Sequence, residues 1–375
     1  MKAVSFGSVF IVSLIILGCV KEFIPEINES PYRVVVDGLI TNQPEGYTIR
    51  LSWSNSVRET TSVPLTRCIV TVHDDLGNVF QFRESSTPGT YNSDMTTFQG
   101  VVGRTYTLHI DTKNATPKHY SYESFPVEMK PVPPIDSLFY EKVLIKEGSL
   151  ERVATEGCQI YLNTYDPELD CRFFRWDYTE NWKCQIPYAN VVNRICWISN
   201  NSNSINIKNT ASLSESQIYR HPILFISNET DRLSIRYSII VNQYSISKNE
   251  FLYWDDIRKI TDNVGGLYDI IPYSLAGNLF CIEDPDEQVL GFFSVSARTS
   301  KRIYVDEFFS GLENIYYPEC LDVQLDVYSK PFSGQNEWWW IIEYYGLWIT
   351  YHKWCADCTA RGTTIRPYFW EDQSY

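Results

Sequence analysis

The chain has 375 residues, with 46 acidic and 32 basic side chains and a formal net charge of −14 at pH 7. This acidity excludes a nucleic-acid-binding protein, because binding to phosphates needs a basic face, and it excludes docking on anionic lipid by charge alone. Aromatic residues make up 15% of the chain, including 26 Tyr and 11 Trp, and such side chains favour strands. We therefore expect a mainly β protein, long enough for two or three domains.

The first 18 residues have the composition of an export signal. Lys2 is followed by the apolar run Val4–Leu17, which is shorter than the roughly 20 residues that a membrane-spanning helix needs. The run ends at Gly18-Cys19, which resembles a bacterial lipobox. We therefore expect residues 1–18 to be a lipoprotein signal peptide and Cys19 to carry the lipid that anchors the protein in the membrane.

Residues 19–30 are predicted to form a polar tether. Lys21-Glu22 within it resembles the lysine-plus-acid signal of bacterial lipoproteins that are exposed on the cell surface. Residues 31–130 hold short segments of strand composition separated by turn residues, a spacing typical of a β-sandwich. These segments are Arg33–Ile40, Tyr47–Trp53, Cys68–His73, Val79–Phe82 and Thr105–Ile110. Their glycine-containing turns resemble those of carboxypeptidase-regulatory, transthyretin-like modules, which usually carry no active site.

Residues 131–134 mark the domain boundary, since three prolines in four residues stiffen the chain into an extended linker. Residues 135–375 again show mainly strand composition. One helix is expected near residues 247–262, because Ser247 and Glu250 form a capping box and apolar residues recur at helical spacing after it. The predicted fold is an N-terminal Ig-like or transthyretin-like β-sandwich, followed by a larger β-rich domain with a short helical insertion.

No sequence motif with a catalytic mechanism is present, whether a zinc-binding helix, a nucleophile elbow, a phosphate loop or a dinucleotide fingerprint. This favours a protein that is not an enzyme and needs no cofactor. A glycosidase remains open as an alternative because its carboxylates have no fixed spacing, and Asp255, Asp256 and Asp284 are the candidate acids. The acidic run at residues 284–287 lacks the spacing of a calcium loop, so we expect a solvated turn and no metal site.

Large aromatic side chains are concentrated in the last forty or so residues. Trp338 and Trp348 could stack on a sugar ring or on another flat ligand. The alternative is that these tryptophans fill the core of the second domain, since each aromatic ring buries about 150–250 Å². Consecutive tryptophans on a strand cannot all face one way, so we expect the core to take most of them.

Nine cysteines remain besides Cys19, and an exported protein can oxidise such cysteines to disulfides. The spacing of Cys184 and Cys196 predicts a local bridge. Cys355 and Cys358 would close only a small ring, which contributes about 2 kcal/mol, whereas a loop of about 100 residues contributes 4–5 kcal/mol. We therefore expect at least one of them to bond to Cys281 or Cys320. A redox pair or half of a zinc site is the alternative interpretation.

Several segments occur together in an order that is similar to a known family. They are the lipobox, Val34–Gly38, the capped helix Ser247–Ile260, Gly277-Asn278, Asp284-Pro285, Gly291–Phe293, Cys355–Thr359, Gly362–Thr364 and Pro367–Trp370. This combination resembles the Bacteroidota outer-membrane lipoproteins assigned to domain of unknown function 4249. Thr363 and Tyr368 depart from the pattern of the family's closing segment. The resemblance implies a lipoprotein that acts beside a TonB-dependent transporter, and it carries over no catalytic residue.

These observations predict a non-enzymatic lipoprotein, lipid-anchored in the outer membrane on its surface or periplasmic face. Its expected role is to capture a nutrient, a small molecule or a glycan, beside a TonB-dependent nutrient transporter. Two alternatives remain: a hydrolase that acts on the imported nutrient, and a purely structural partner of the transporter.

Overall fold

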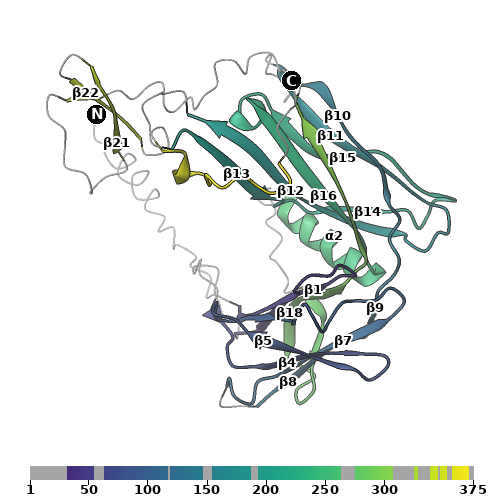
Figure 1. Ribbon diagram of the computed structural model, residues 1–375. Helices are drawn as coiled ribbons and strands as arrows, with labels where there is room; N and C mark the ends of the chain where they lie inside the picture. Colours follow the sequence, from purple (N-terminus) through teal and green to yellow (C-terminus); the bar gives the residue numbers. More distant parts are fainter. Residues whose placement is uncertain are drawn as a thin grey trace, which may run out of the picture.

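The computed structural model describes residues 32–54, 63–116, 119–146, 154–186, 193–262, 275–306, 325–327, 338–344, 347–352 and 357–370. Strands predominate among these residues and α2 (Lys248–Asp262) is their one α-helix, so the prediction of a mainly β protein is confirmed. Figure 1 shows two β-rich parts with α2 at their junction. Within the described ranges, no helix has both the length and the apolar character needed to cross a membrane.

Nine strands of the first part form a sheet that closes on itself. In order around the sheet they are β1 (Val34–Ile40), β18 (Gln288–Val295), β17 (Ala276–Cys281), β8 (Ser121–Ser124), β7 (Thr105–Asp111), β4 (Ile69–Asp74), β5 (Val79–Glu84), β6 (Thr90–Asn92) and β2 (Thr48–Trp53). Pairing of β2 with β1 completes this ring of described strands. Two short strands pair with members of the ring: β3 (Val63–Pro64) pairs with β2, and β9 (Val127–Glu128) pairs with β7.

Along most strands of this sheet every second side chain is buried, which explains how the sheet encloses its core. On β7 the side chains of Tyr106, Leu108 and Ile110 are buried, and the residues between them are half-exposed. Alternate residues of a strand point to opposite faces, so each strand sends one set of apolar side chains inward. His109, between buried Leu108 and Ile110, accordingly lies on the outer face.

The closed sheet includes two strands from much later in the chain. β18 runs parallel to β1, with a register from Val35–Leu290 to Ile40–Val295. Gly291 permits the close approach, since its φ is +86° and a Cβ there would lie 1.9 Å from the carbonyl oxygen of Val36. The sequence prediction instead divided the chain into consecutive domains at residues 131–134, because a parallel pair between distant segments leaves no local signal. The likeness to a transthyretin-like sandwich stays a prediction.

The second part contains two sheets that share one core. One sheet has the order β10 (Ile135–Lys146), β11 (Ala154–Asp166) and β15 (Ser216–Ser227). The other has the order β13 (Ile195–Asn201), β12 (Phe173–Gln185), β16 (Arg236–Ser245) and β19 (Arg298–Val305), with β14 (Asn206–Asn209) also paired to β12. Ile160 of the first sheet and Trp176 and Ile239 of the second belong to the same buried cluster.

The proline segment is attached to the second part rather than spanning open space. The amide of Gln243 donates to the Pro133 carbonyl oxygen at 2.8 Å and to Thr164 Oγ1 at 3.0 Å. The indole nitrogen of Trp176 donates to Gln243 Oε1 at 2.9 Å. A buried polar network therefore fixes the path of the chain between the two parts.

The predicted helix is confirmed, but its capping box is only half formed. Ser247 Oγ accepts a hydrogen bond from the Glu250 amide at 3.1 Å, as an N-cap residue does. The Glu250 carboxylate turns into the protein, where Oε1 accepts from Ser294 Oγ at 2.7 Å and from the Trp254 indole at 3.3 Å. Phe251 and Trp254 pack against apolar residues of β14 and β16, as the helical periodicity predicted.

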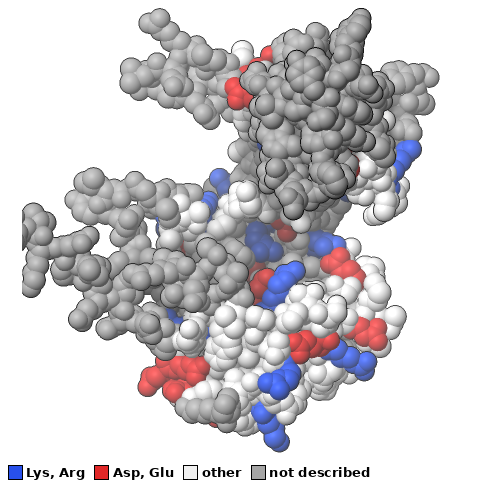
Figure 2. All heavy atoms as spheres, turned by 90° about the vertical axis from the view of Figure 1, so that its left-hand side faces the viewer, with Lys and Arg blue, Asp and Glu red and all other residues white. Residues whose placement is uncertain are grey.

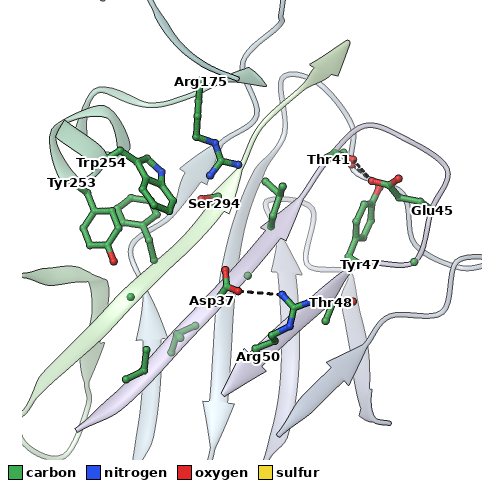
Figure 3. A pocket seen from close by; sticks show the side chains of 17 residues that line it. Asp37, Thr41, Glu45, Tyr47, Thr48, Arg50, Arg175, Tyr253, Trp254 and Ser294 are labelled. Atoms are coloured by element: carbon green, nitrogen blue, oxygen red, sulfur yellow. Dashed lines mark hydrogen bonds and ion pairs between the residues drawn. The ribbon is translucent and has the colours of Figure 1, made fainter. Parts of the chain in front are cut away.

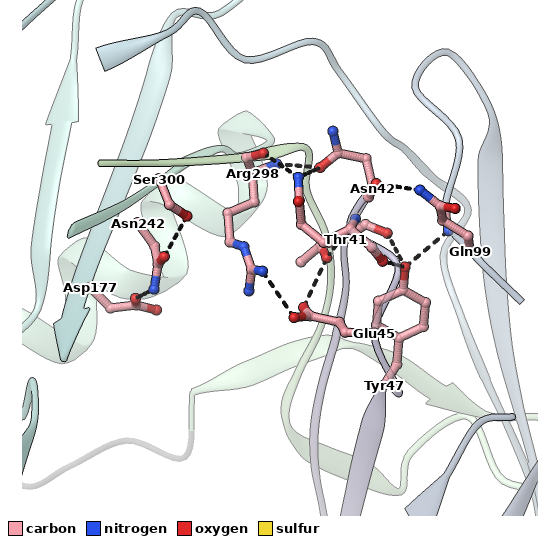
Figure 4. A network of polar contacts seen from close by, with 11 residues as sticks. Thr41, Asn42, Glu45, Tyr47, Gln99, Asp177, Asn242, Arg298 and Ser300 are labelled. Atoms are coloured by element: carbon pink, nitrogen blue, oxygen red, sulfur yellow. Dashed lines mark hydrogen bonds and ion pairs between the residues drawn. The ribbon is translucent and has the colours of Figure 1, made fainter. Parts of the chain in front are cut away.

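Polar contacts tie the loop after β1 to the start of β19 (Figure 4). The Arg298 guanidinium donates to Glu45 Oε2 at 2.9 Å, and the Arg298 amide donates to Asn42 Oδ1 at 2.8 Å. Gln43 donates to the Arg298 carbonyl oxygen at 2.9 Å. The Tyr47 hydroxyl donates to the carbonyl oxygens of this loop, which holds its shape. These contacts fix the closed sheet against the second part.

The structure places a disulfide between Cys196 and Cys358, which are 162 residues apart. The predicted Cys184–Cys196 bridge is therefore wrong. Cys184 lies opposite Cys196 in a hydrogen-bonded strand pair, because the Ile186 amide donates to the Arg194 carbonyl and such pairs recur every second residue. The Cβ atoms of residues opposed in this way are about 5.5 Å apart, farther than the roughly 3.8 Å typical of a disulfide.

The expectation that Cys355 or Cys358 bonds to a distant cysteine is confirmed for Cys358, although the partner is neither Cys281 nor Cys320. Cys281 is a buried thiol of the closed sheet, with Sγ 3.7 Å from Glu283 Oε2. Cys320 and Cys355 lie outside the described residues.

Candidate ligand-binding site

A cavity of about 460 Å³ lies at the junction of the two parts, and we call it the junction cavity. Strands β1, β2 and β18 supply its floor, α2 supplies one wall, and Arg175 reaches it from β12 (Figure 3). Cavities at domain interfaces, largely apolar with a few convergent polar groups, are typical places for small-ligand binding.

One wall of the junction cavity is aromatic. Tyr253 and Trp254 are neighbours on α2, and the Tyr253 ring centroid lies 5.1 Å from that of Phe292 on β18. Burial, together with the nearby Asp37 carboxylate, raises the pKa of the Tyr253 hydroxyl, which therefore stays neutral. A neutral, flat and partly apolar wall of this kind suits the face of a sugar or of another ring.

Arg175 stands beside this wall, held by two aromatic rings. Its guanidinium carbon lies 4.9 Å from the Tyr244 ring centroid and 5.1 Å from that of Trp254. Tyr244 is the residue directly opposite Arg175 on β16, so the strand register itself places this ring. Cation–π contacts orient the guanidinium without using its N–H groups.

Two acids line the junction cavity, and an arginine binds each of them. Asp37 on β1 pairs with Arg50 on β2 at 3.2 Å, and both side chains are largely exposed. Glu45 pairs with Arg298 at 2.9 Å, and its other oxygen accepts from the Thr41 hydroxyl at 3.2 Å. The charges at the rim are thus already matched.

A buried acid lies behind the cavity wall. Glu250 is fully buried, and burial raises the pKa of its carboxyl even though the charge of Arg175 and hydrogen bonds from Ser294 and Trp254 act in the opposite direction. Within the described part of the chain, its Oε2 atom has no hydrogen-bond partner. Ser294, which lines the cavity, connects this acid to the ligand space.

The outer surface near the junction is mixed in charge. Figure 2 shows acidic and basic side chains side by side at the hollow above the lower lobe, rather than a patch of one sign. The net acidity of the chain is therefore not concentrated at this hollow, and a charged ligand meets no uniformly repulsive face there.

Sequence reasoning did not single out Arg175, Tyr253 or Ser294. The sequence nevertheless pointed to the place of this site, because three of the segments that carry the family resemblance meet in this one cavity. These segments are Val34–Gly38, the helix Ser247–Ile260 and Gly291–Phe293. Only the fold brings them together, since the parallel pairing of β1 with β18 joins the first to the third.

The candidate acids of the hydrolase interpretation do not line the junction cavity. Asp255 binds Arg258 and Lys259 of the same helix at 2.5 and 2.8 Å, and Asp256 lies 3.1 Å from Lys259. Asp284 lies in the turn between β17 and β18, where its Oδ1 accepts from the Asp286 amide. Nowhere in the described ranges do three or more His, Cys, Asp or Glu side chains gather to hold a metal ion.

The other predicted site residues lie where the structure gives little or nothing about their side chains. Trp338 begins β21 (Trp338–Tyr344) and Trp348 lies on β22 (Leu347–His352), and β22 pairs with β21 on one side and with β20 (Leu325–Val327) on the other. The structure does not describe the side chains of these two tryptophans, and Cys19 lies outside the described residues. Stacking by the two tryptophans and lipidation of Cys19 therefore stay predictions.

Comparison with known proteins gives one informative match. The family model "Domain of unknown function (DUF4249)" matches residues 20–302. No curated protein matches the chain. The matched range is more than half of the chain and contains every residue that lines the junction cavity. The chain belongs to the DUF4249 family.

Proposed function

We propose that this chain is a non-enzymatic lipoprotein of the Bacteroidota outer membrane that captures a small ligand in the junction cavity, beside a TonB-dependent nutrient transporter. The observation that carries the proposal is the cavity itself, about 460 Å³ in volume, with an aromatic wall and an arginine beside it. The lipobox-like segment ending at Cys19 supports the anchor, and the resemblance described above supports the transporter as partner.

Binding fits this cavity better than hydrolysis does. The two acids that line it, Asp37 and Glu45, are each held by an arginine, whereas a glycosidase needs a pair of carboxyl groups that are available to its substrate. The closed sheet then has the role of a scaffold, as in the transthyretin-like modules that it is predicted to resemble. A purely structural partner of the transporter would have no use for the junction cavity.

A pull-down from detergent-solubilised outer membranes tests this function. We expect the wild-type protein to recover a TonB-dependent barrel, and the purified protein to bind ligand saturably without converting it. Hydrolysis of a polymer by the pure protein, with no barrel recovered, would favour the hydrolase. Recovery of a barrel by a protein that binds no ligand would favour the structural partner.

The anchor has its own test. Cys19→Ala is expected to release the protein from the membrane fraction, or to retain residues 1–18 in its mass, because the lipid can no longer be attached. Cys68→Ala is the matched control, since Cys68 is a half-buried thiol directly before β4. Identical fractionation and mass for Cys19→Ala and the wild type would contradict the lipid anchor.

A further inference from the structure

Arg175 is the one charged side chain lining the junction cavity that has no ionic partner among the described residues. The other three are Asp37, Glu45 and Arg50, and each of these is in an ion pair. The Arg175 guanidinium packs against the faces of Tyr244 and Trp254, and its buried Nε has no hydrogen-bond partner among the described residues. A buried donor left in this state costs free energy unless a bound group satisfies it.

The direction of the guanidinium matters as much as its charge. In Figure 3 the end of the Arg175 side chain points into the cavity, with Trp254 on one side and Ser294 below it. Because two rings cover the faces of the guanidinium, its N–H edges remain for a ligand. A planar fork of donors fits an oxyanion with two parallel hydrogen bonds.

Glu250 does not neutralise this charge by contact. No ion pair within 4.0 Å joins it to Arg175, and its Oε1 is occupied by Ser294 and Trp254. Complete burial raises the pKa of the Glu250 carboxyl, which favours the neutral form of the acid. Glu250 also lies behind the cavity wall and not in its lining, so among the described lining residues Arg175 is the charged side chain that no ion pair matches.

We propose that Arg175 binds a carboxylate, phosphate or sulfate group of the captured ligand, while the body of the ligand lies against Tyr253, Trp254 and Phe292. This deepens the proposed function, because it takes the junction cavity as the capture site. The ligand class is thus a small acidic molecule with one flat or apolar face. Trp254 has two parts in this site, since it forms the wall and also orients Arg175.

The test is a calorimetric titration of the full mature chain at fixed ionic strength. The probes are glucuronate and glucose, which differ in one carboxylate, together with inorganic phosphate and inorganic sulfate. We expect at least one oxyanion to bind saturably, and glucuronate to bind at least tenfold more tightly than glucose. The affinity for the anion should fall as sodium chloride is raised, because the contact is ionic.

Variants assign this binding to one side chain. Arg175→Gln is expected to weaken anion binding at least tenfold. Arg175→Lys is expected to retain the salt dependence with reduced affinity, because lysine keeps the positive charge but lacks the planar pair of N–H donors. Arg220→Gln is the matched control: Arg220 also lies over two aromatic rings, Phe139 and Tyr161, but it is paired with Glu141 and does not line the junction cavity, so its loss should change affinity less than threefold. A melting curve for each variant confirms that it is folded.

The outcomes separate this proposal from the proposed function. If no oxyanion binds saturably, or if Arg175→Gln binds the anion as tightly as the wild type, the proposal is wrong. If glucose binds as well as glucuronate in the wild type, the cavity captures ligands but not through an acidic group. If Arg175-dependent anion binding is found and no transporter is recovered by pull-down, the anion site stands and the role beside a transporter fails.

Discussion

Removal of the Cys196–Cys358 disulfide is expected to lower the free energy of unfolding by about 5 kcal/mol. The two cysteines are 162 residues apart, and the loss of chain entropy that such a crosslink imposes on the unfolded state grows with the logarithm of the loop length, which gives about this value. The bond also holds the segment 357–370 against β13, where Trp197 and Thr363 exchange backbone hydrogen bonds.

The comparison is between the wild type and Cys196→Ala/Cys358→Ala in urea, with the free energy of unfolding as the measurement. Replacing both cysteines prevents Cys196 from pairing with the nearby Cys184. Cys68→Ala is the control, because this half-buried thiol directly before β4 is not in a disulfide. We expect the control to lose no more than about 1 kcal/mol. A loss below about 1 kcal/mol in the double variant would show that the disulfide does not form or contributes little.

Truncation of Trp176 is expected to lower the free energy of unfolding by a similar amount, about 5 kcal/mol. The side chain is 1% exposed, and its ring lies parallel to that of Phe174 with the centroids 5.7 Å apart. Removing a buried indole costs about 3–5 kcal/mol through the cavity that it leaves. Trp176→Ala also leaves Gln243 Oε1 without its donor, and a buried unpaired acceptor costs about 1–3 kcal/mol.

Trp176→Phe is the matched variant, because it keeps a ring and removes the donor. We expect it to lose about 2 kcal/mol, clearly less than Trp176→Ala, in the same urea experiment. The difference between the two variants measures the packing of the ring, and the loss in Trp176→Phe measures the network through Gln243 to Pro133. Equal losses in the two variants would mean that packing of the indole contributes little to stability.

Much of the fold could be predicted from the sequence because its signals are local. The strand composition of Thr105–Ile110 and the serine cap of α2 depend on neighbouring residues only, and both elements are found in the structure. The closed sheet could not be predicted in this way, because the pairing of β1 with β18 joins distant segments. The partner of Cys358 was missed for a related reason, since strand pairing and not sequence spacing determines which sulfur atoms meet.

The candidate site was harder to predict than the fold. The junction cavity is assembled from segments that are separated in the sequence, and its central arginine lies in an ordinary strand pattern between Phe174 and Trp176. What marks Arg175 is the absence of an acidic partner among the described residues together with the rings of Tyr244 and Trp254 around it, and both are properties of the fold. The acids that the sequence did suggest, such as Asp255, are bound to basic residues of their own helix.

Native mass spectrometry tests the central claim, that the junction cavity is a ligand site, most directly. The full mature chain is incubated with the nutrients on which its host grows, and the intact complex is weighed beside that of Tyr253→Ala, which removes part of the aromatic wall and leaves Arg175 in its ring contacts. We expect the wild type to retain one small molecule of defined mass, and the variant to retain less than a tenth as much. The same bound mass in both proteins, or none in either, would contradict the account.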